Sequence, residues 1–261
     1  MRYPRHDPVE TRQMDNPGYI ALSRLVAQNR ATAVLAHNMA NAETPGFRAS
    51  RPVFAQYLER QQNTAAVPGG RDVAFSWDRA TWRDATPGAV QTTGNPLDVA
   101  INGEGYFTIQ TPQGERYTRA GHFTIGGDGQ IVDTEGNAVL DHGGNPLRVG
   151  ANDTRLTIRG DGTLSSENGE IGRIRIVRFA DTQRLVAEGD RHFAAAPGQA
   201  PETIDRPALV QGALEGSNVR PVLELTRLTA EMREFQFVAQ FAEKEGERIG
   251  NAVERILRRR S

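Results

Sequence analysis

The last forty residues of the chain carry an apolar repeat that constrains the fold more than any other feature. Apolar or small side chains recur at alternating spacings of three and four, which places them along one side of a helix. Phe237, Val238 and Phe241 add a second apolar side, which favours a multi-stranded assembly over a simple dimer; a long core helix in a monomer is the alternative. The repeat consists of Leu225, Leu228, Met232, Phe235, Ala239, Ala242, Gly246, Ile249, Val253 and Ile256.

A second helix is predicted near the start of the chain, from Pro17 to Asn41. Asp15 or Asn16 can cap it, and proline suits the first helical position. It ends before Pro45, because residues that precede a proline leave the α region. Its side chains are mostly small, which suits close packing against several neighbours, with an ordinary surface helix as the alternative. The positions expected to pack against the C-terminal repeat, within and between subunits, are Leu22, Val26, Ala33, Ala36 and Ala40.

The sequence of the middle of the chain predicts antiparallel β-structure. Phe123–Ile131 and Leu156–Leu164 are near-repeats of each other, and each contains an Asp-Gly pair between two short apolar runs. Asp-Gly supplies the positive φ angles of a tight hairpin turn. We therefore expect two related hairpins within a small antiparallel domain.

Together these signals predict an α+β fold in which long N- and C-terminal helices form a coiled-coil-like layer beside a central antiparallel β-rich domain.

At the start, Met1–Gln13 is polar, contains two prolines and has no helical period. Either the gene start has been placed too far upstream, or the chain carries a short disordered extension. The predicted division is a disordered extension 1–15, the N-terminal helix and following turn 16–60, an extended connection 61–96, a β-rich outer domain 97–205 and a C-terminal helical segment 206–261.

Composition argues against several classes of function. The 31 Lys and Arg residues nearly balance the 32 Asp and Glu residues, so bulk positive charge does not drive nucleic-acid binding. The absence of cysteine excludes disulfides, thiolate metal sites and thiol catalysis. No apolar run approaches the roughly 20 residues of a membrane span, and the polar start is not that of a cleaved signal peptide. The five histidines have no metal-binding spacing. We therefore predict no catalytic, cofactor or metal site.

Three segments carry sequence motifs. His37–Arg48 reads HNMANAETPGFR, Thr93–Phe107 reads TGNPLDVAINGEGYF with YTRAGHF shortly after it, and Gln211–Val219 reads QGALEGSNV. In this order they resemble the rod and hook family of bacterial flagellar axial proteins, with a departure at His37, where alanine or asparagine is usual. The residues that carry the resemblance are Asn38, Ala40, Asn41, Thr44, Gly46, Phe47, Gly94, Pro96, Leu97, Asp98, Gly103, Gly105, Phe107, Gly121, Phe123, Leu214, Glu215, Ser217, Asn218 and Val219.

The resemblance implies a structural subunit of the flagellar basal-body rod. Within the family the chain is most similar to proximal-rod members, with a distal-rod or hook protein as the alternative. Such proteins have no catalytic activity or cofactor. They leave the cell through the flagellar type III export apparatus without a cleaved signal peptide, and they assemble helically with themselves and with other rod proteins in the periplasm to transmit torque. A secreted β-rich binding module or an enzyme is less favoured.

Overall fold

The computed structural model describes residues 17–60 and 72–258, which fall into two compact units. The helical unit comprises the described residues of Met1–Ala33, Pro52–Ala80 and Arg227–Ser261. The β body comprises Val34–Arg51 and Thr81–Thr226. The predicted extension 1–15 lies outside the described residues. The five-segment division made from the sequence stays a prediction.

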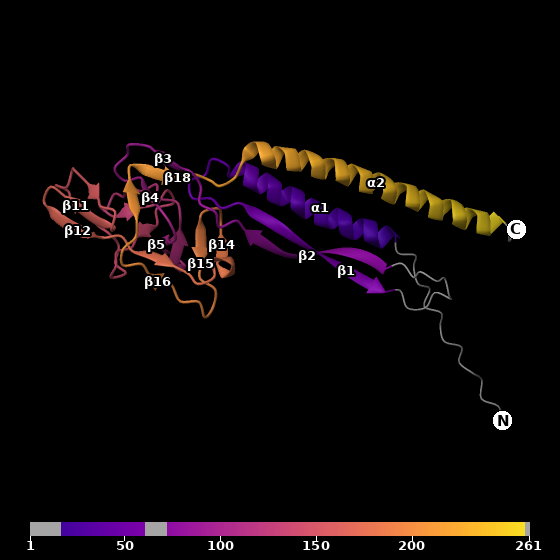
Figure 1. Ribbon diagram of the computed structural model, residues 1–261, viewed down its shortest axis with the longest axis horizontal. Coiled ribbons are helices and arrows are strands. Elements are labelled where there is room, and N and C mark those ends of the chain that lie inside the picture. Colours follow the sequence, from indigo (N-terminus) through magenta and orange to yellow (C-terminus); the bar gives the residue numbers. More distant parts are fainter. Residues whose placement is uncertain (1–16, 61–71, 259–261) are drawn as a thin grey trace, which may run out of the picture. The chain divides into compact units, whose positions relative to one another are not determined.

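Both expected helices are present (Figure 1). Helix α1 spans Pro17–Ala40 and helix α2 spans Pro221–Arg258, so a proline occupies the first position of each. A short 3₁₀ helix, η1, covers Thr182–Arg184, and the side chain of Asp181 caps it by accepting a hydrogen bond from the backbone N–H of Gln183. No helix among the described residues is long and apolar enough to span a membrane.

Strands β1, Ser50–Arg60, and β2, Asp72–Arg83, form a two-stranded ribbon. The sequence pattern does not predict this ribbon, because Pro52 lacks the N–H that a central strand must donate. A two-stranded ribbon has only edge strands, and an edge strand tolerates a proline. Strand β1 lies within the predicted segment 16–60, and β2 lies within the predicted connection 61–96.

The largest sheet of the β body is antiparallel and has strand order β14-β15-β6-β5-β9-β8-β7, with β13 pairing to both β5 and β16. Its central strand is β5, whose Thr108 lies opposite Tyr117 of β6. The strands are β5 Tyr106–Thr111, β6 Gly114–Thr118, β7 Thr124–Ile125, β8 Ile131–Val132, β9 Ala138–Val139, β13 Ile176–Arg178, β14 Val186–Glu188, β15 His192–Ala194 and β16 Glu202–Thr203.

Three smaller sheets complete the β body. One contains β10, Thr157–Ile158, β11, Thr163–Ser166, and β12, Gly169–Arg173. In the other two, chain segments from beyond residue 205 pair with earlier strands. These strands are β17 Leu209–Gln211 against β4 Val99–Ile101, and β18 Ala213–Glu215 against β3 Val90–Thr92.

The two predicted hairpins are confirmed. Strands β7 and β8 pair antiparallel, and so do β10 and β11. Gly129 and Gly162, the glycines of the two Asp-Gly pairs, adopt φ of 78° and 89°. These are values that glycine reaches without the steric cost of a side chain.

The hydrophobic core lies within the β body. Phe107 and Phe123 meet edge to face, with ring centroids 5.1 Å apart, and both side chains are buried. Phe107 and Ile109 point to the same face of β5, as the two-residue period of a strand requires. The main core cluster comprises Leu97, Val99, Ile101, Phe107, Ile109, Phe123, Ile131, Val139, Leu147, Val149, Ile158, Leu164, Ile174, Ile176 and Leu209.

The predicted coiled-coil-like layer is wrong. The described residues form two α-helices and a body of antiparallel strands, and among them the apolar lines predicted to meet do not form a seam. On α1 the whole predicted line, Leu22, Val26, Ala33, Ala36 and Ala40, is exposed. Alanines lie nearly all round this helix, so its faces differ little in hydropathy. The sequence periodicity therefore does not identify which face is buried. The residues of α1 that are buried are Ala21, Ala27, Gln28, Ala31, Leu35 and Asn38.

The predicted repeat on α2 is likewise mostly exposed. Leu225, Met232, Phe235 and Ile249 are exposed, whereas Leu228, Ala239 and Ala242 are half-buried. The side chains of Val253 and Ile256 lie outside the described residues. Within the helical unit the polar pair Arg24 and Glu234 joins α1 to α2 by a hydrogen-bonded ion pair. The large apolar side chains of the repeat are therefore available to other molecules.

The hairpin region contains a carboxylate with an unusually low pKa. Hydrogen bonds from the Thr154 hydroxyl, at 2.6 Å, and from the backbone N–H groups of Arg155 and Thr154 lower the pKa of exposed Glu167 to about 2. Since this pKa is below its ordinary value, the interaction stabilises the fold above the ordinary pKa and is lost as the pH falls towards 2. We expect an NMR titration of the Glu167 carboxyl carbon to have its midpoint near 2. A midpoint near the ordinary value of about 4.3 would contradict these hydrogen bonds.

Candidate functional site at the junction of the sequence motifs

The three motif segments, far apart in the sequence, meet in the β body. The backbone N–H of Gly46 donates to the carbonyl of Glu215 at 2.8 Å. Phe47 packs in a small apolar cluster with Ala49 and Val219. The mid-chain motif closes on itself where the N–H of Val99 donates to the carbonyl of Gly121 at 2.9 Å. The motifs therefore build one junction rather than three separate features.

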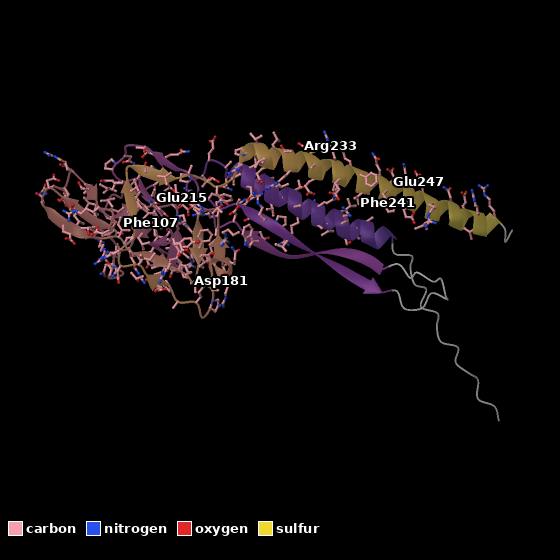
Figure 2. All side chains as sticks on the ribbon, viewed as in Figure 1. Phe107, Asp181, Glu215, Arg233, Phe241 and Glu247 are labelled. Atoms are coloured by element: carbon pink, nitrogen blue, oxygen red, sulfur yellow. The ribbon has the colours of Figure 1, made fainter. Side chains whose placement is uncertain are left out.

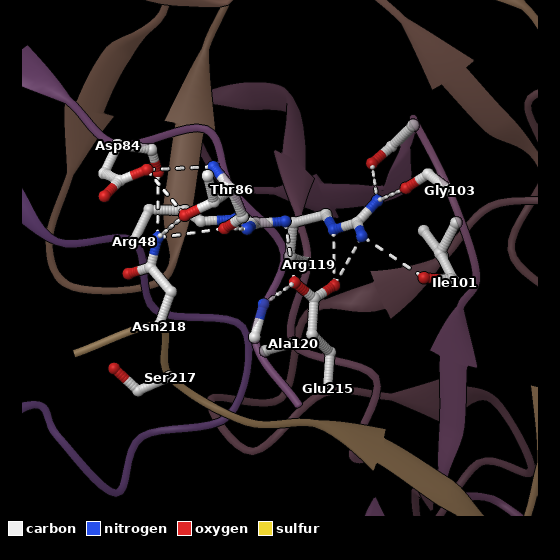
Figure 3. Close-up of polar contacts among 12 residues, drawn as sticks. Arg48, Asp84, Thr86, Ile101, Gly103, Arg119, Ala120, Glu215, Ser217 and Asn218 are labelled. Atoms are coloured by element: carbon white, nitrogen blue, oxygen red, sulfur yellow. Dashed lines mark hydrogen bonds and ion pairs between the residues drawn. The ribbon is translucent and has the colours of Figure 1, made fainter. Parts of the chain in front are cut away.

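A buried carboxylate lies at the centre of this junction. The Glu215 carboxylate accepts ion-pair contacts from Arg48 at 2.6 Å and from Arg119 at 2.5 Å, so one residue of each motif takes part (Figure 3). The side chains of Arg48, Glu215 and Arg119 are 7%, 2% and 2% exposed. We call these three residues the ion triad.

Further hydrogen bonds satisfy the ion triad. Arg119 donates to the carbonyls of Ile101, Gly103 and Gly105 at 3.2, 3.0 and 2.6 Å, and Arg48 donates to the carbonyl of Thr86. The N–H of Gly88 donates to Glu215 at 3.0 Å. Burial lowers the pKa of Arg48, and the Glu215 charge opposes that shift. Buried charges persist only when they are paired and hydrogen-bonded in this way.

Asn218 connects the C-terminal motif to the segments on either side of the ribbon. Its side-chain oxygen accepts from the N–H of Ala49 at 2.7 Å. Its side-chain amide donates to the carbonyls of Asp84 and Thr86 at 3.0 and 2.9 Å. One asparagine thus holds three chain segments together, which requires both the donor and the acceptor of its amide.

A second polar cluster joins the last turn of α1 to the first turn of α2. Asn38 exchanges two 2.9 Å hydrogen bonds with the backbone of Ser50 and donates to Glu224 at 3.4 Å. Glu224 is fully buried and pairs with Arg51 at 2.6 Å. Within the β body these contacts fix the ends of both helices to the start of β1.

Asp98 stabilises the turn of the mid-chain motif. This buried carboxylate accepts from the Thr93 hydroxyl at 2.6 Å and the Asn95 amide at 3.0 Å, and it lies 2.6 Å from the Nδ1 atom of His122. At the end of α1 the Thr44 hydroxyl donates to Asn41 at 3.0 Å. Most polar motif side chains therefore stabilise turns and junctions.

Four charged residues of the site, Arg48, Arg51, Arg119 and Glu224, were not singled out from the sequence. Arg48 and Arg119 lie inside the motifs, and each is the only arginine of its motif segment, which is the signal that could have identified them. Arg51 and Glu224 lie in no motif and carry no such signal. No cluster of His, Asp and Glu suited to a metal ion occurs within the described residues. The chemistry of the site is that of a structural joint.

Comparison with known proteins identifies the family of the chain. Residues 19–48 match the family described as "Flagella basal body rod protein", residues 100–166 the "Flagellar hook protein FlgE/F/G D1 domain", and residues 210–253 the "Flagellar basal body rod FlgEFG protein C-terminal". Each match contains or overlaps one of the three motif segments.

Relatives match over most of their length. The chain is 35% identical to the "Flagellar basal-body rod protein FlgF" of Caulobacter vibrioides, over 93% of this chain and 98% of the relative. It is 34% identical to FlgF of Mesorhizobium japonicum, over 87% and 91%. It is also 33% identical to the "Flagellar basal-body rod protein FlgG" of Agrobacterium fabrum, over 83% and 90%. The chain therefore belongs to the family of flagellar basal-body rod proteins and is FlgF-like.

Proposed function

We propose that the chain is a structural subunit of the proximal part of the flagellar rod, which assembles helically and transmits torque for motility. The extent of the match to FlgF relatives supports this assignment. The single structural observation that carries it is the line of large apolar side chains left exposed on α2, including Met232, Phe235 and Ile249. Exposed apolar surface of this extent is typical of a binding interface.

We propose the two predicted helix lines as the assembly surface. On α1 the surface comprises Leu22, Val26, Ala33, Ala36 and Ala40. On α2 it comprises the predicted repeat from Leu225 to Ile256, of which Leu225, Met232, Phe235 and Ile249 are exposed in the single chain. Burying these side chains between subunits would contribute about 25 cal/mol for each Å² removed from water. A rod that transmits torque needs such buried seams, because stiffness depends on close packing between neighbours.

A distal-rod role is the second candidate. The FlgG relative of Agrobacterium fabrum supports it, since its identity of 33% is close to that of the FlgF relatives. The two roles share the same assembly chemistry and differ in position along the rod. The resemblance favours a non-enzymatic protein without a cofactor in either role.

Location and partners follow from the same proposal. The subunit would lie in the periplasmic rod of the basal body and contact other rod proteins. It would reach that place through the flagellar type III export apparatus, without a cleaved signal peptide. A chain that passes unfolded through an export channel benefits from the absence of cysteine, because no disulfide has to form on arrival.

Deletion of the gene tests the assignment. We expect a deletion strain to be non-motile and to contain basal bodies that stop before the distal rod, and we expect the full chain supplied from a plasmid to restore swimming. Electron microscopy of purified basal bodies shows where along the rod assembly stops. Rods that extend through the distal segment in the deletion strain would contradict the proximal assignment, and normal motility would contradict both rod roles.

Phe235→Asp tests the assembly surface. Phe235 is 40% exposed in the single chain, so we expect circular dichroism and the free energy of unfolding to change little. Burying the new carboxylate between subunits would cost several kcal/mol, so cells with this variant should not swim. Phe235→Leu, which keeps the apolar contact, is the matched control and should swim. Normal swimming of Phe235→Asp cells would remove this position from the interface.

A further inference from the structure

The chain contains two Asn-Gly pairs, Asn102-Gly103 and Asn168-Gly169, and both lie in the β body. Such a pair can lose ammonia without an enzyme, because the backbone nitrogen of the glycine attacks the side-chain carbonyl of the asparagine. Glycine favours this attack, since it has no side chain to restrict the backbone or to hinder the approach. Both asparagines are exposed, so exposure alone does not distinguish them. The hydrogen bonds of the two pairs differ.

The turn Asn102–Gly105 connects β4 to β5, the strand that carries the core residue Phe107, labelled in Figure 2. The backbone N–H of Asn102 donates to the carbonyl of Ala208 at 2.7 Å, which anchors the start of the turn. Among the described residues, neither the side chain of Asn102 nor the backbone N–H of Gly103 makes a hydrogen bond. A Cβ atom added at Gly103 would meet nothing within 4 Å beyond its chain neighbours. The attacking nitrogen and the leaving group are therefore both available.

Water, the other reactant, reaches the same turn from two sides. The residues Gly103, Glu104 and Gly105 line a cavity of about 530 Å³ within the β body. A cavity of this size holds many water molecules, since each occupies about 30 Å³ in the liquid. The outer side of the turn is exposed at Asn102, Gly103 and Glu104. Hydrolysis at this turn is therefore not limited by access of water.

Asn168 also precedes a glycine, but hydrogen bonds hold its reacting groups. Its side-chain nitrogen, which must leave as ammonia, donates to the carbonyl of Asn152 at 3.2 Å and to the Asp153 carboxylate at 2.8 Å. Its backbone N–H donates to the Ser166 hydroxyl at 3.1 Å. Gly169 begins strand β12 and pairs with Ser166 of β11. Attack at this pair would first have to break several of these contacts.

We propose that Asn102 is a site of spontaneous deamidation. The Gly103 nitrogen forms a bond to the side-chain carbonyl carbon of Asn102, and the bond from that carbon to the side-chain nitrogen breaks. The proton of the Gly103 nitrogen leaves with the NH₂ group as ammonia, and a cyclic succinimide results. Water then opens the ring at either carbonyl, which yields aspartate or isoaspartate. The inference is independent of the rod function.

The isoaspartate product would disturb the junction of the motifs. The Arg119 guanidinium donates to the carbonyls of Ile101 and Gly103 at 3.2 and 3.0 Å (Figure 3). These two acceptors lie on either side of Asn102. Isoaspartate adds one CH₂ group to the main chain between them, so a single guanidinium no longer reaches both at hydrogen-bonding distance. Because Arg119 also pairs with Glu215, the ion triad would be weakened.

Mass spectrometry of the full chain tests the site. The protein is incubated at mildly alkaline pH and then digested at mildly acidic pH. Deamidation replaces NH₂ by OH, so the masses of the two peptides that contain Asn102 and Asn168 report on the two sites separately. We expect Asn102 to react at least about tenfold faster than Asn168, because hydrogen bonds hold the Asn168 side chain. In concentrated urea the two rates should become similar, because both asparagines precede glycine.

Asp153→Ala is the matched variant for this comparison. It removes an acceptor that holds the Asn168 side chain, so the Asn168 rate should rise while the Asn102 rate stays the same. Circular dichroism confirms that the variant is folded. Equal rates in the folded wild-type chain, a faster reaction at Asn168, a rate ratio that urea leaves unchanged, or an Asn168 rate that Asp153→Ala leaves unchanged would each overturn the proposal.

The stability of the deamidated chain tests its effect on the junction. This chain carries one more negative charge, so anion exchange separates it from the intact chain. We expect the separated fraction to unfold at a lower urea concentration than the intact chain. Asn102→Asp adds the same charge without lengthening the main chain, and it should unfold near the wild-type midpoint. A deamidated fraction with the midpoint of the intact chain would overturn the link between this turn and the ion triad.

Discussion

Replacing Glu215 by alanine is expected to lower the free energy of unfolding of the chain by about 3–5 kcal/mol. The substitution removes the only carboxylate of the ion triad and leaves Arg48 and Arg119 buried side by side without their counter-charge. Like charges that are shielded from water repel strongly. The junction of the three motifs should therefore open before the rest of the β body.

Glu188→Ala is the matched control for this result. Glu188 also pairs with an arginine, Arg116, at 2.5 Å, but the Glu188 side chain is 43% exposed. Removing a pair that water can screen should cost no more than about 1 kcal/mol. Urea denaturation of the two full-length variants and the wild type measures both losses in the free energy of unfolding. Equal, small losses would show that the ion triad does not stabilise the junction.

Gly121→Ala is expected to destabilise the chain to a similar degree, by about 3 kcal/mol or more. A Cβ atom at this buried position would lie 1.7 Å from the carbonyl oxygen of Val99, far inside van der Waals contact. The neighbour is backbone and cannot rotate away. The same backbone forms the hydrogen bond from the Val99 N–H to the Gly121 carbonyl, so the strand would have to separate from the turn.

Gly127→Ala serves as the comparison for Gly121→Ala. Gly127 is exposed and does not have a positive φ, and a Cβ atom added there would meet nothing within 4 Å beyond its own chain neighbours. Alanine there reduces the freedom of the unfolded chain, so stability should be unchanged or rise slightly. Thermal unfolding of the two variants distinguishes a local steric clash from a general intolerance of alanine for glycine in the β body.

The parts of the fold that depend on local signals are predictable from the sequence. Proline at the first position and the break before Pro45 predict α1 within one residue, and the Asp-Gly pairs predict the hairpins that turn at Gly129 and Gly162. The buried face of α1 is not predictable in the same way. Gln28 and Asn38 are buried there while Leu22 and Val26 are exposed, which reverses the usual hydropathy rule.

The contacts that make the site depend on long-range pairing. Strands β17 and β18 return from beyond residue 205 to pair with β4 and β3, and this return carries Glu215 to Arg48 and Arg119. No sequence periodicity links segments that lie about one hundred residues or more apart. The motifs therefore indicated which segments matter, whereas only the structure shows that they form one junction.

The most direct test of the rod assignment is the composition of the rod itself. Hook–basal bodies purified from cells that express the chain can be stripped of filament and hook and then analysed by quantitative mass spectrometry. We expect peptides of the β body to remain with the stripped rod in the wild type and to be absent from the rod fraction of cells that carry Phe235→Asp. Recovery of the wild-type chain only with the hook, or only outside the basal body, would contradict the account.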